Sequence, residues 1–526
     1  MSATSVVDVQ PEFTEVLIIG AGPSGLMGAL ALGGLGVKTI LVDRRAPGTI
    51  YGSADGIQPA TIEMWESYGL KERLFQDGHK ITTYAAYTTN EAGLLERQPQ
   101  GFDIDVPDAR YPFEVAIPTE ALEGVVRDAA AKSGVPVQWT WIPTSIVTEE
   151  KDGDEYPVKV ALQHPTDASK TRVIHAKYVI GSDGARSWVR SNVRIDMVKA
   201  ESDDEAITFG VVNFTPDTDI PDMTTKTVIT TPICGTIGYI SHPDGKGRLY
   251  IPLLPTVDTR KIKEEELLAI MQETLDKSCK PYYVKITEPT WVSTYRVVQS
   301  VAARFAVKDR VFISGDAAHT HSAKAGQGAN ASMRDTHNLA WKIAYVLRGW
   351  ASPSLLATYD LERRTYAQAL IALDKDIAKA FDGGKGDYKK IWDDKNRFIS
   401  GVGVVYDSSL TPSSTPSQLA PNITPGERLP PVAILRLSDW HPANVHDLIK
   451  SDGTFKLVFF PGTAAASREK LPGFVERFSN ELVQGGKPKE MVKTSTVIQG
   501  AKANVHWTDV PEVVRDRFTC VPFSVS

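Results

Sequence analysis

Cysteine is scarce in this sequence: the 526 residues include only three, at Cys234, Cys279 and Cys520. These cysteines lie far apart and form no Cys-x-x-Cys pair. A small secreted protein stapled by disulfides, or a domain built around a structural zinc, needs several closely spaced cysteines. The scarcity therefore argues against a disulfide framework and a structural zinc site, and it favours a reducing, cytoplasmic setting.

The sequence also lacks an excess of positive charge and any long apolar run. Its formal net charge is −6 and it contains no basic tract, which argues against nucleic acid as a partner. The apolar stretches fall well short of the about 20 residues that a membrane-spanning helix needs. The opening segment MSATSVVDVQPEFTE has no signal-peptide pattern. The length instead predicts a globular protein of two or three domains.

A nucleotide-binding signature is present near the N-terminus, in EVLIIGAGPSGLMGALALGGLGVKTILVDRR. An apolar run over 16–19 meets a Gly-x-Gly-x-x-Gly turn, a helical stretch follows to about Gly34, and a second apolar run over 37–42 ends in Asp43. In this context the glycines permit a tight turn and close approach of a pyrophosphate to the helix N-terminus. Asp43 is placed to accept hydrogen bonds from ribose hydroxyls. The alternative is a glycine-rich turn without a ligand, and the motif does not distinguish NAD from FAD. The turn residues are Gly20, Gly22, Pro23, Ser24 and Gly25.

Two further segments each place an aspartate after a short apolar run. KYVIGSDGARSWVR contains Asp183-Gly184, which by itself is better explained as a strand followed by a turn than as a ligand site. DRVFISGDAAH contains Gly315-Asp316 and leads into a glycine-rich loop and a helical pattern. A glycine-rich loop that enters a helix offers free backbone N–H groups to an anion or to a polar ring edge. The loop residues are Gly326, Gln327, Gly328, Ala329 and Asn330.

Taken together, GAGPSG…DRR, SDGARSWVR and GDAAHTHSAKAGQGANASMRDTHNLAWK resemble the single-component FAD-dependent aromatic hydroxylases, in particular the fungal phenol 2-monooxygenase family. The resemblance covers about 15–406 and, more faintly, the remainder. It implies bound FAD, with Asp43 and Arg44 at the adenosine and Asp316 at the ribityl or pyrophosphate portion. It places Asp183 near the pyrophosphate, and the backbone of 326–330 against the isoalloxazine.

The same resemblance implies a function. The chain is expected to hydroxylate a phenolic ring ortho to an existing hydroxyl, with NADPH or NADH and O2 through a flavin C4a-hydroperoxide. No second Gly-x-Gly-x-x-Gly follows, which fits transient docking of the nicotinamide. Alternatives are a dearomatising, decarboxylating or Baeyer–Villiger oxygenation of a polyketide-like phenol, a dehydrogenase that does not use O2, and a non-catalytic FAD-fold binding protein. A homodimer is also compatible with the resemblance.

Three residues are the candidates for catalysis. Asp55 lies in SADGIQ and, taken alone, is better explained as a turn aspartate before Gly56. In GRLYIPLL, strand alternation places Arg248 and Tyr250 on one face. The resemblance implies that Asp55 accepts the proton of the substrate hydroxyl and that Tyr250 binds the substrate oxygen or flavin. Arg248 is then expected to lower the proton affinity of Asp55 or of the phenolate.

Other positions near these motifs qualify the hypothesis. His319 and His321 have the spacing of metal ligands, but no Cys or carboxylate cluster accompanies them, so we expect no metal. Two positions depart from the family. Ala323 replaces a proline that would stiffen the flavin loop, and Thr119 replaces a flavin-contacting glutamine and is expected to serve as a helix N-cap.

The predicted fold class is α/β and α+β, with a Rossmann-type FAD-binding domain, a β-sheet substrate domain and a C-terminal, shortened thioredoxin-like domain. The C-terminal part has no Cys-x-x-Cys, so it has no dithiol chemistry. The predicted boundaries are 1–68, 113–190 and 291–373 for the FAD domain, 69–112 and 191–290 for the substrate domain, 374–410 for a helical connection, 411–431 for a linker, and 432–526 for the thioredoxin-like domain.

Overall fold

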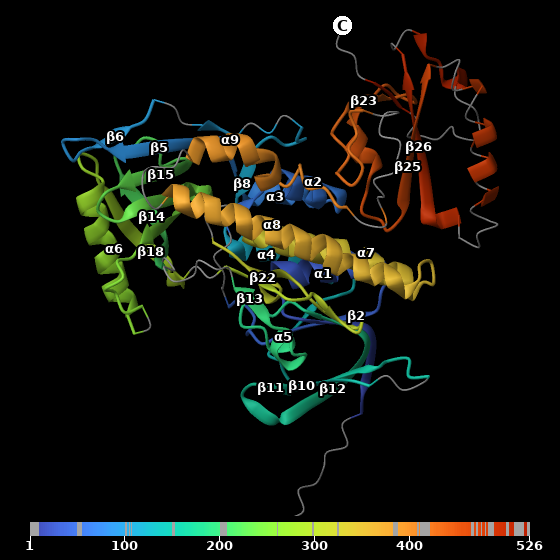
Figure 1. Ribbon diagram of the computed structural model, residues 1–526, viewed down its shortest axis with the longest axis horizontal. Coiled ribbons are helices and arrows are strands. Elements are labelled where there is room, and N and C mark those ends of the chain that lie inside the picture. The colour runs from blue at the N-terminus through green and yellow to red at the C-terminus, as the bar shows by residue number, and fades with distance from the viewer. Residues whose placement is uncertain are drawn as a thin grey trace, which may run out of the picture.

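The computed structural model of the chain contains two large sheets, a layer of helices and a separate C-terminal sheet (Figure 1). Among the residues that it describes, no helix is long and apolar enough to cross a membrane. The described residues are 10–49, 55–99, 102–104, 106, 108–149, 153–199, 208–259, 261–296, 299–322, 326–381, 388–407, 410, 421–463, 468–469, 472–474, 476–478, 480–481, 489–500, 504–509 and 520–522.

The first sheet is parallel at its centre. Its path is β10-β11-β12-β1-β2-β9, with β21 beside β12 and β20 beside β21. β1 runs parallel to β2 and β12, and β12 runs parallel to β21. Their carboxyl ends therefore meet at one edge, where ligands bind in sheets of this kind. The strands are β1 (Glu12–Ile19), β2 (Thr39–Asp43), β9 (Val137–Trp139), β10 (Ile142–Thr148), β11 (Val158–His164), β12 (Asp167–Gly181), β20 (Ala306–Val307) and β21 (Val311–Ile313).

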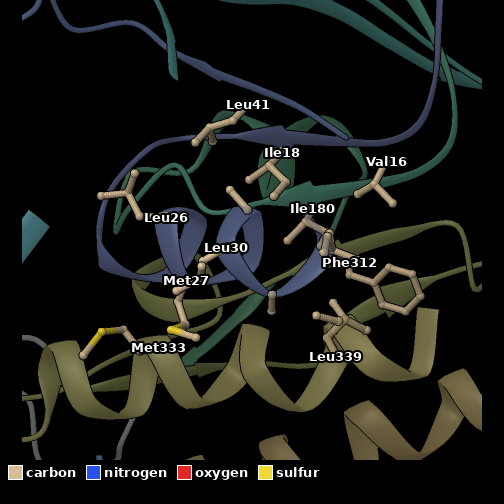
Figure 2. Packing of buried hydrophobic residues seen from close by; sticks show 14 of the residues in the cluster. Val16, Ile18, Leu26, Met27, Leu30, Leu41, Ile180, Phe312, Met333 and Leu339 are labelled. Carbon is tan, nitrogen blue, oxygen red and sulfur yellow. The ribbon is translucent and has the colours of Figure 1, made fainter. Parts of the chain in front are cut away.

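Helix α1 is buried between this sheet and helix α7 (Figure 2). Leu26 and Leu30 of α1, Ile18 of β1, and Met333 and Leu339 of α7 all belong to one buried apolar cluster. Burial on two sides explains why the helical stretch is apolar nearly throughout. The helices of this layer are α1 (Pro23–Gly34), α4 (Thr119–Lys132), α7 (Gly328–Leu347) and α8 (Ala357–Phe381).

The second sheet is mostly antiparallel and follows the path β18-β14-β17-β16-β15-β5-β6, with β7 beside β5. Leu249 and Ile251 of β17 are buried in a cluster with Met271 and Leu275 of helix α6. The other side chains of β17, Arg248 and Tyr250, therefore point to the opposite face of the sheet. The elements are β5 (Thr83–Thr89), β6 (Leu95–Arg97), β7 (Phe102–Asp103), β14 (Thr208–Thr218), β15 (Lys226–Thr231), β16 (Gly235–Ser241), β17 (Gly247–Pro252), β18 (Val284–Arg296) and α6 (Glu264–Ser278).

Two small sheets lie between the large ones, in the orders β3-β8-β4 and β13-β19-β22. They carry the chain between the first and second sheets, so they position the loops at the junction. Their strands are β3 (Gly56–Ile57), β4 (His79–Ile81), β8 (Glu114–Ala116), β13 (Met197–Lys199), β19 (Ser300–Ala302) and β22 (His319–Thr320). The other α-helices of the described chain are α2 (Pro59–Ser67), α3 (Lys71–Asp77), α5 (Trp188–Asn192) and α9 (Tyr388–Ile399).

The C-terminal sheet packs on the edge of the helical layer (Figure 1). Phe455 contacts the rings of Trp341 and Tyr345 of α7, and the Tyr345 hydroxyl donates to the Gly453 carbonyl at 3.0 Å. Asp447 pairs with Arg110 at 2.8 Å. The strand order is β24 (Pro442–Asn444), β23 (Ala433–Arg436), β27 (Cys520–Pro522), β26 (Val492–Gln499) and β25 (Phe455–Thr463).

Two elements cross the segment boundaries expected from sequence. β18 lies entirely in the second sheet, so the chain returns to the first sheet after residue 296 and not at 291. α8 continues without interruption through residue 373. Of the predicted linker 411–431, the first ten residues lie outside the described chain.

The burial of His337 in α7 predicts that the protein loses stability at low pH. Its Nδ1 lies 2.9 Å from the Tyr68 hydroxyl, and burial, together with the positive charges of Arg334 and Arg363, lowers its pKa to about 4. In the unfolded chain histidine has a pKa of about 6.5. Between this pH and about 4, the unfolded chain therefore binds a proton on His337 that the folded protein does not bind. This stability is therefore complete above about pH 6.5 and is lost as the pH falls towards 4.

We expect acidification from pH 7 to 5 to lower the free energy of unfolding by about 1–2 kcal/mol through His337. His337→Gln should remove this part of the pH dependence, which urea unfolding at the two pH values measures. Tyr68→Phe is the matched control, because it removes the hydrogen-bond partner and keeps the titrating ring. If the free energy of unfolding falls by the same amount between pH 7 and pH 5 in His337→Gln and in the parent protein, His337 is not the group responsible.

Candidate active site

The three aspartate- or glycine-bearing turns meet at the carboxyl edge of the first sheet. β1, β12 and β21 each end immediately before one of them. The Ser314 hydroxyl lies 2.9 Å from the hydroxyl of Ser24 and 2.9 Å from that of Ser182. These three serines come from the three separate sequence segments, so their hydrogen bonds join the turns into one structure.

The first turn has the backbone geometry that the glycine pattern predicts. Gly20 has φ +104°, and a Cβ there would lie 2.3 Å from the Ser182 carbonyl oxygen. A Cβ on Gly25 would lie 1.9 Å from the Gly20 carbonyl oxygen. Gly22 differs, because a Cβ there would meet no atom within 4 Å. Gly22 is the N-cap of α1, so open space faces a helix N-terminus whose first N–H groups are available to an anion.

Asp43 braces this turn from the end of β2. Its Oδ2 accepts the Ala21 N–H at 2.6 Å, and its Oδ1 accepts the Arg45 backbone N–H at 2.7 Å and the Arg45 Nε–H at 3.1 Å. Arg45 also pairs with Glu123 at 3.0 Å, and burial raises the pKa of Glu123 to about 7 against the opposing charge of Arg45. Arg44, the residue that the sequence analysis named, is exposed. Sequence reasoning missed Arg45 and Glu123.

The second turn ends in a capped helix. Both oxygens of Asp183 are used locally: Oδ1 accepts the Ser187 hydroxyl, and Oδ2 accepts the N–H groups of Trp188 and Val189 at 2.7 and 3.0 Å. Burial raises the pKa of Asp183, and these hydrogen bonds oppose the rise. Arg190 donates to the Ala317 carbonyl at 3.0 Å and so ties this turn to the third one.

The third turn separates a structural aspartate from an exposed one. Asp335 is fully buried and accepts the Gly315 N–H at 2.9 Å, with His319 at 2.8 Å and Arg363 at 2.7 Å. Asp316 is accessible to solvent, yet burial by the surrounding protein raises its pKa. The surrounding protein therefore disfavours the charged form of this carboxyl, although the residue reaches solvent.

The glycine-rich loop enters α7 with open space in front of its first turn. A Cβ on Gly328, the first residue of α7, would meet no atom within 4 Å, and Gly326 has φ +61°. The Gln327 side chain instead donates to the Ile399 carbonyl at 2.5 Å. Ala323, whose effect the sequence analysis raised, lies outside the described residues.

These features fit FAD. Two glycine-lined helix N-termini, at Gly22 and Gly328, face open space at one sheet edge and suit the pyrophosphate and the polar edge of the ring. Asp316 suits the hydroxyls of a ribityl chain.

Thr119 begins α4, and Pro118 is the N-cap, so the expected N-cap role of Thr119 is wrong. The extended ψ of 143° at Pro118 places the helix boundary one residue earlier.

The catalytic candidates meet at one carboxylate oxygen. The Tyr250 hydroxyl donates to Oδ2 of Asp55 at 3.1 Å, and Nη1 of Arg248 lies 3.6 Å from the same oxygen. Asp55, Arg248 and Tyr250 are 7%, 1% and 8% exposed, which excludes a solvated arginine and a surface turn aspartate. Nε2 of His242 lies 3.9 Å from Oδ2 of Asp55. Sequence reasoning missed His242, which stands before the Pro-Asp-Gly turn that joins β16 and β17.

The charges at this cluster are stabilised by their neighbours. Burial alone would lower the pKa of Arg248, but the negative charge of Asp55 and the hydrogen bonding of Tyr250 raise it, so the guanidinium stays charged. Arg248 Nε also donates to the Asn213 side chain at 2.6 Å, and its guanidinium lies 5.1 Å from the centre of the Trp291 ring. Burial and the Asp55 charge raise the pKa of Tyr250, so its hydroxyl stays protonated.

Asn330 connects the two halves of the site. Its Oδ1 accepts the Gln58 N–H at 2.9 Å, and its Nδ2 donates to the carbonyls of Gly56 and Gly326, each at 2.8 Å. The Gly56 carbonyl lies next to Asp55 in the chain, and the Gly326 carbonyl belongs to the glycine-rich loop. Asn330 thus fixes the Asp55 segment to the start of α7, and its side chain holds protein backbone.

The two candidate metal ligands have other partners. His319 Nε2 lies 2.8 Å from Asp335, and His321 Nδ1 lies 2.9 Å from the Ser322 carbonyl. The two rings stack at 6.2 Å. Within the described part of the chain, no group of three or more His, Cys, Asp or Glu side chains is arranged to hold a metal ion.

Comparison with known proteins identifies the family. A family described as FAD binding domain matches residues 13–374, and one described as phenol hydroxylase, C-terminal dimerisation domain, matches residues 404–520. A phenol 2-monooxygenase of Aspergillus fumigatus is 32% identical over 520 residues, covering 96% of this chain and 85% of the relative. A 3-hydroxybenzoate 4-monooxygenase of Comamonas testosteroni is 31% identical over 494 residues, covering 88% and 76%.

Solved structures share the fold. The flavin-dependent monooxygenase PieE, in complex with FAD and substrate, superposes with a TM-score of 0.72 at 20% identity, covering 96% of this chain and 93% of that one. Aklavinone-11 hydroxylase, in complex with FAD and aklavinone, gives a TM-score of 0.70 at 22% identity, covering 93% and 89%. The fold class and the FAD cofactor expected from the sequence are confirmed.

Proposed function

The chain belongs to the FAD-dependent aromatic monooxygenases that carry a phenol hydroxylase dimerisation domain, and on this premise we propose that it hydroxylates a phenolic ring ortho to an existing hydroxyl group. The observation that carries the proposal is the buried Asp55 carboxylate, held by Tyr250 and Arg248 and tied through Asn330 to the loop that enters α7. A phenol needs such a group, because its ring becomes electron-rich when its proton is removed.

Bound FAD supplies the redox chemistry: NAD(P)H provides the electrons, and O2 is activated so that one oxygen atom enters the ring and the other leaves as water. We assign its contacts to the backbone of Gly22 and of Gly328, and to the carboxylate of Asp316. Asp43 acts by bracing the first turn, and Arg45 provides the nearest cation to it.

Asp55 accepts the substrate proton in this proposal. Tyr250, Arg248 and His242 all approach Oδ2 of Asp55, so we assign Oδ1 to the substrate hydroxyl. Tyr250 orients the carboxylate through its 3.1 Å hydrogen bond. Arg248, charged and buried, stabilises the negative charge that deprotonation places on the substrate oxygen. The burial of all three side chains supports a site from which water is kept away during the reaction.

A panel of simple, ortho-substituted and polyketide-like phenols tests the function. We expect at least one of them to stimulate NADPH or NADH oxidation by the holoenzyme and to yield a product with one oxygen atom from labelled O2 and an intact aromatic ring. Stimulated oxidation without label incorporation would indicate a dehydrogenase, and a product with an opened or dearomatised ring would indicate a different oxygenation. Absence of stimulation by every phenol rejects the proposal.

The matched dimerisation domain supports a homodimer, which light scattering on the purified holoenzyme measures. We further assign the first sheet with α1, α4 and α7 to cofactor binding, and the second sheet to the substrate. A reducing, cytoplasmic setting is consistent with the free thiols of Cys234 and Cys279.

A further inference from the structure

His242 occupies a buried position beside the candidate base that no step above uses. It follows β16 directly, its N–H donates to the Lys246 carbonyl at 2.8 Å, and only 4% of the residue is exposed. Its Nε2 makes no hydrogen bond and lies 3.9 Å from Oδ2 of Asp55. A buried polar atom without a partner destabilises a fold by about 1–3 kcal/mol. Such an atom therefore calls for an explanation.

The surroundings keep the His242 ring neutral. Burial lowers its pKa to about 4, although the negative charge of Asp55 acts in the opposite direction. Arg248 and His79 contribute positive charge that lowers the pKa further. These three side chains are the charged or titratable groups that act on the ring, and they come from the Asp55 segment, from β17 and from β4. A neutral imidazole has one nitrogen free to accept a proton.

His79, at the start of β4, is a titratable side chain that reaches solvent. In the sheet β3-β8-β4, Gly56 and His79 both lie opposite Ala116, on either side of β8. Two strand spacings of about 4.8 Å therefore separate the Asp55 end of β3 from His79. His79 is partly exposed, and its Nε2 lies 3.1 Å from the Thr224 carbonyl. His79 therefore reaches water, and its charge acts on the His242 ring, so we assign it as the exit for a proton that leaves His242.

We propose that His242 relays the substrate proton from Asp55 to His79 and from there to water. The proposal rests on the proposed hydroxylation of a phenol. The O–H bond of the substrate breaks and its proton binds Asp55. The proton then passes to Nε2 of His242, which releases a proton in turn towards His79 and solvent. No electrons are transferred, and Asp55 is ready again once the proton has left.

The relay is required because Asp55 is closed off from water. A protonated carboxyl that cannot release its proton returns it to the phenolate, so the ring stays poorly reactive. Arg248 cannot replace His242, since a guanidinium does not accept a proton. His242, with Nε2 3.9 Å from Oδ2, is the neutral proton acceptor beside Asp55, and we assign it the step that empties the base. It acts through Asp55 and is therefore a positioning residue.

The test compares His242→Gln with the parent holoenzyme, using the phenol that the panel selects. Single-turnover hydroxylation is measured from pH 6 to pH 9, with FAD content and thermal stability recorded for each protein. We expect the variant to hydroxylate about 10- to 100-fold more slowly near pH 6–7, and to recover much of that loss as the pH rises and the phenol ionises before it binds. His79→Gln should show a smaller loss of the same pH shape.

Tyr239→Phe is the matched control. Tyr239 lies on β16, three residues before His242, and its buried hydroxyl also has no hydrogen-bond partner, but it packs on the α6 side of the sheet. This variant should keep the rate and the pH profile of the parent. A parental profile in His242→Gln, or an equal loss at every pH, overturns the relay. A parental profile in His79→Gln overturns the exit through His79. Failure of the parent itself to hydroxylate any phenol rejects the proposed function instead.

Discussion

Replacement of Asp55 by asparagine is expected to lower the rate of hydroxylation by about two to four orders of magnitude while FAD stays bound. The variant keeps the size and the hydrogen-bonding capacity of the side chain, so Tyr250 and Arg248 keep a partner. It removes the carboxylate that Tyr250 and Arg248 approach, and with it the group assigned to take the phenolic proton. Electrons from NAD(P)H should then reach O2 without an activated ring, and hydrogen peroxide should accumulate.

The measurement couples three readouts: NAD(P)H oxidation, hydroxylated product and hydrogen peroxide, all on protein with the parental FAD absorbance. Tyr250→Phe serves as a graded comparison, since it removes one hydrogen bond to a charged group, worth about 1.5–3 kcal/mol. It should hydroxylate about tenfold or more below the parent and above Asp55→Asn. Normal hydroxylation by Asp55→Asn means that Asp55 is not the base.

Substitutions in the first turn should separate cofactor binding from folding. Gly22→Ala places a methyl group in open space at the N-terminus of α1, where φ is −76° and suits any residue. The protein should fold with its stability unchanged in the absence of FAD. Its affinity for FAD should fall by about 10- to 100-fold, because the methyl group holds the pyrophosphate away from the N–H groups and weakens charge-assisted hydrogen bonds.

Gly25→Ala should instead lower the stability of the fold. Its Cβ would lie 1.9 Å from the Gly20 carbonyl oxygen, which is backbone and cannot move without displacing β1 or α1. We expect a loss of about 2–4 kcal/mol in the free energy of unfolding, whether or not FAD is present. Titration of apoprotein with FAD and urea unfolding of the same samples measure the two effects. If Gly22→Ala binds FAD with the affinity of the parent protein, the pyrophosphate does not lie against Gly22.

The cofactor end of the site was largely predictable from sequence, because its requirements are local. A tight turn between a strand and a helix needs glycine at positions such as Gly20 and Gly25 whatever the rest of the chain does. The same holds for the alternation that places Arg248 and Tyr250 on one face of β17. Local rules were less reliable where a neighbour decides the outcome, as at Arg44 and Arg45. There, Glu123, which lies on α4, provides the partner that turns Arg45 inward.

The substrate end depended on contacts that no local pattern specifies. Asp55 and Tyr250 are 195 residues apart, and only the packing of β3 and β17 brings them to 3.1 Å. His242 gave no signal in the sequence, because a histidine before a Pro-Asp-Gly turn is ordinary unless a buried carboxylate lies beside it.

By itself, the sequence determined the nucleotide-binding turn, the order of the three motifs and the family that they resemble, since backbone geometry at glycine and strand alternation are properties of neighbouring residues. Only the tertiary structure decided which side chains share the Asp55 carboxylate and which aspartates are structural. It also decided that Asn330 joins the base to the cofactor loop. Burial, charge pairing and pKa arise between segments that are distant in the chain, so they exist only once those segments have packed.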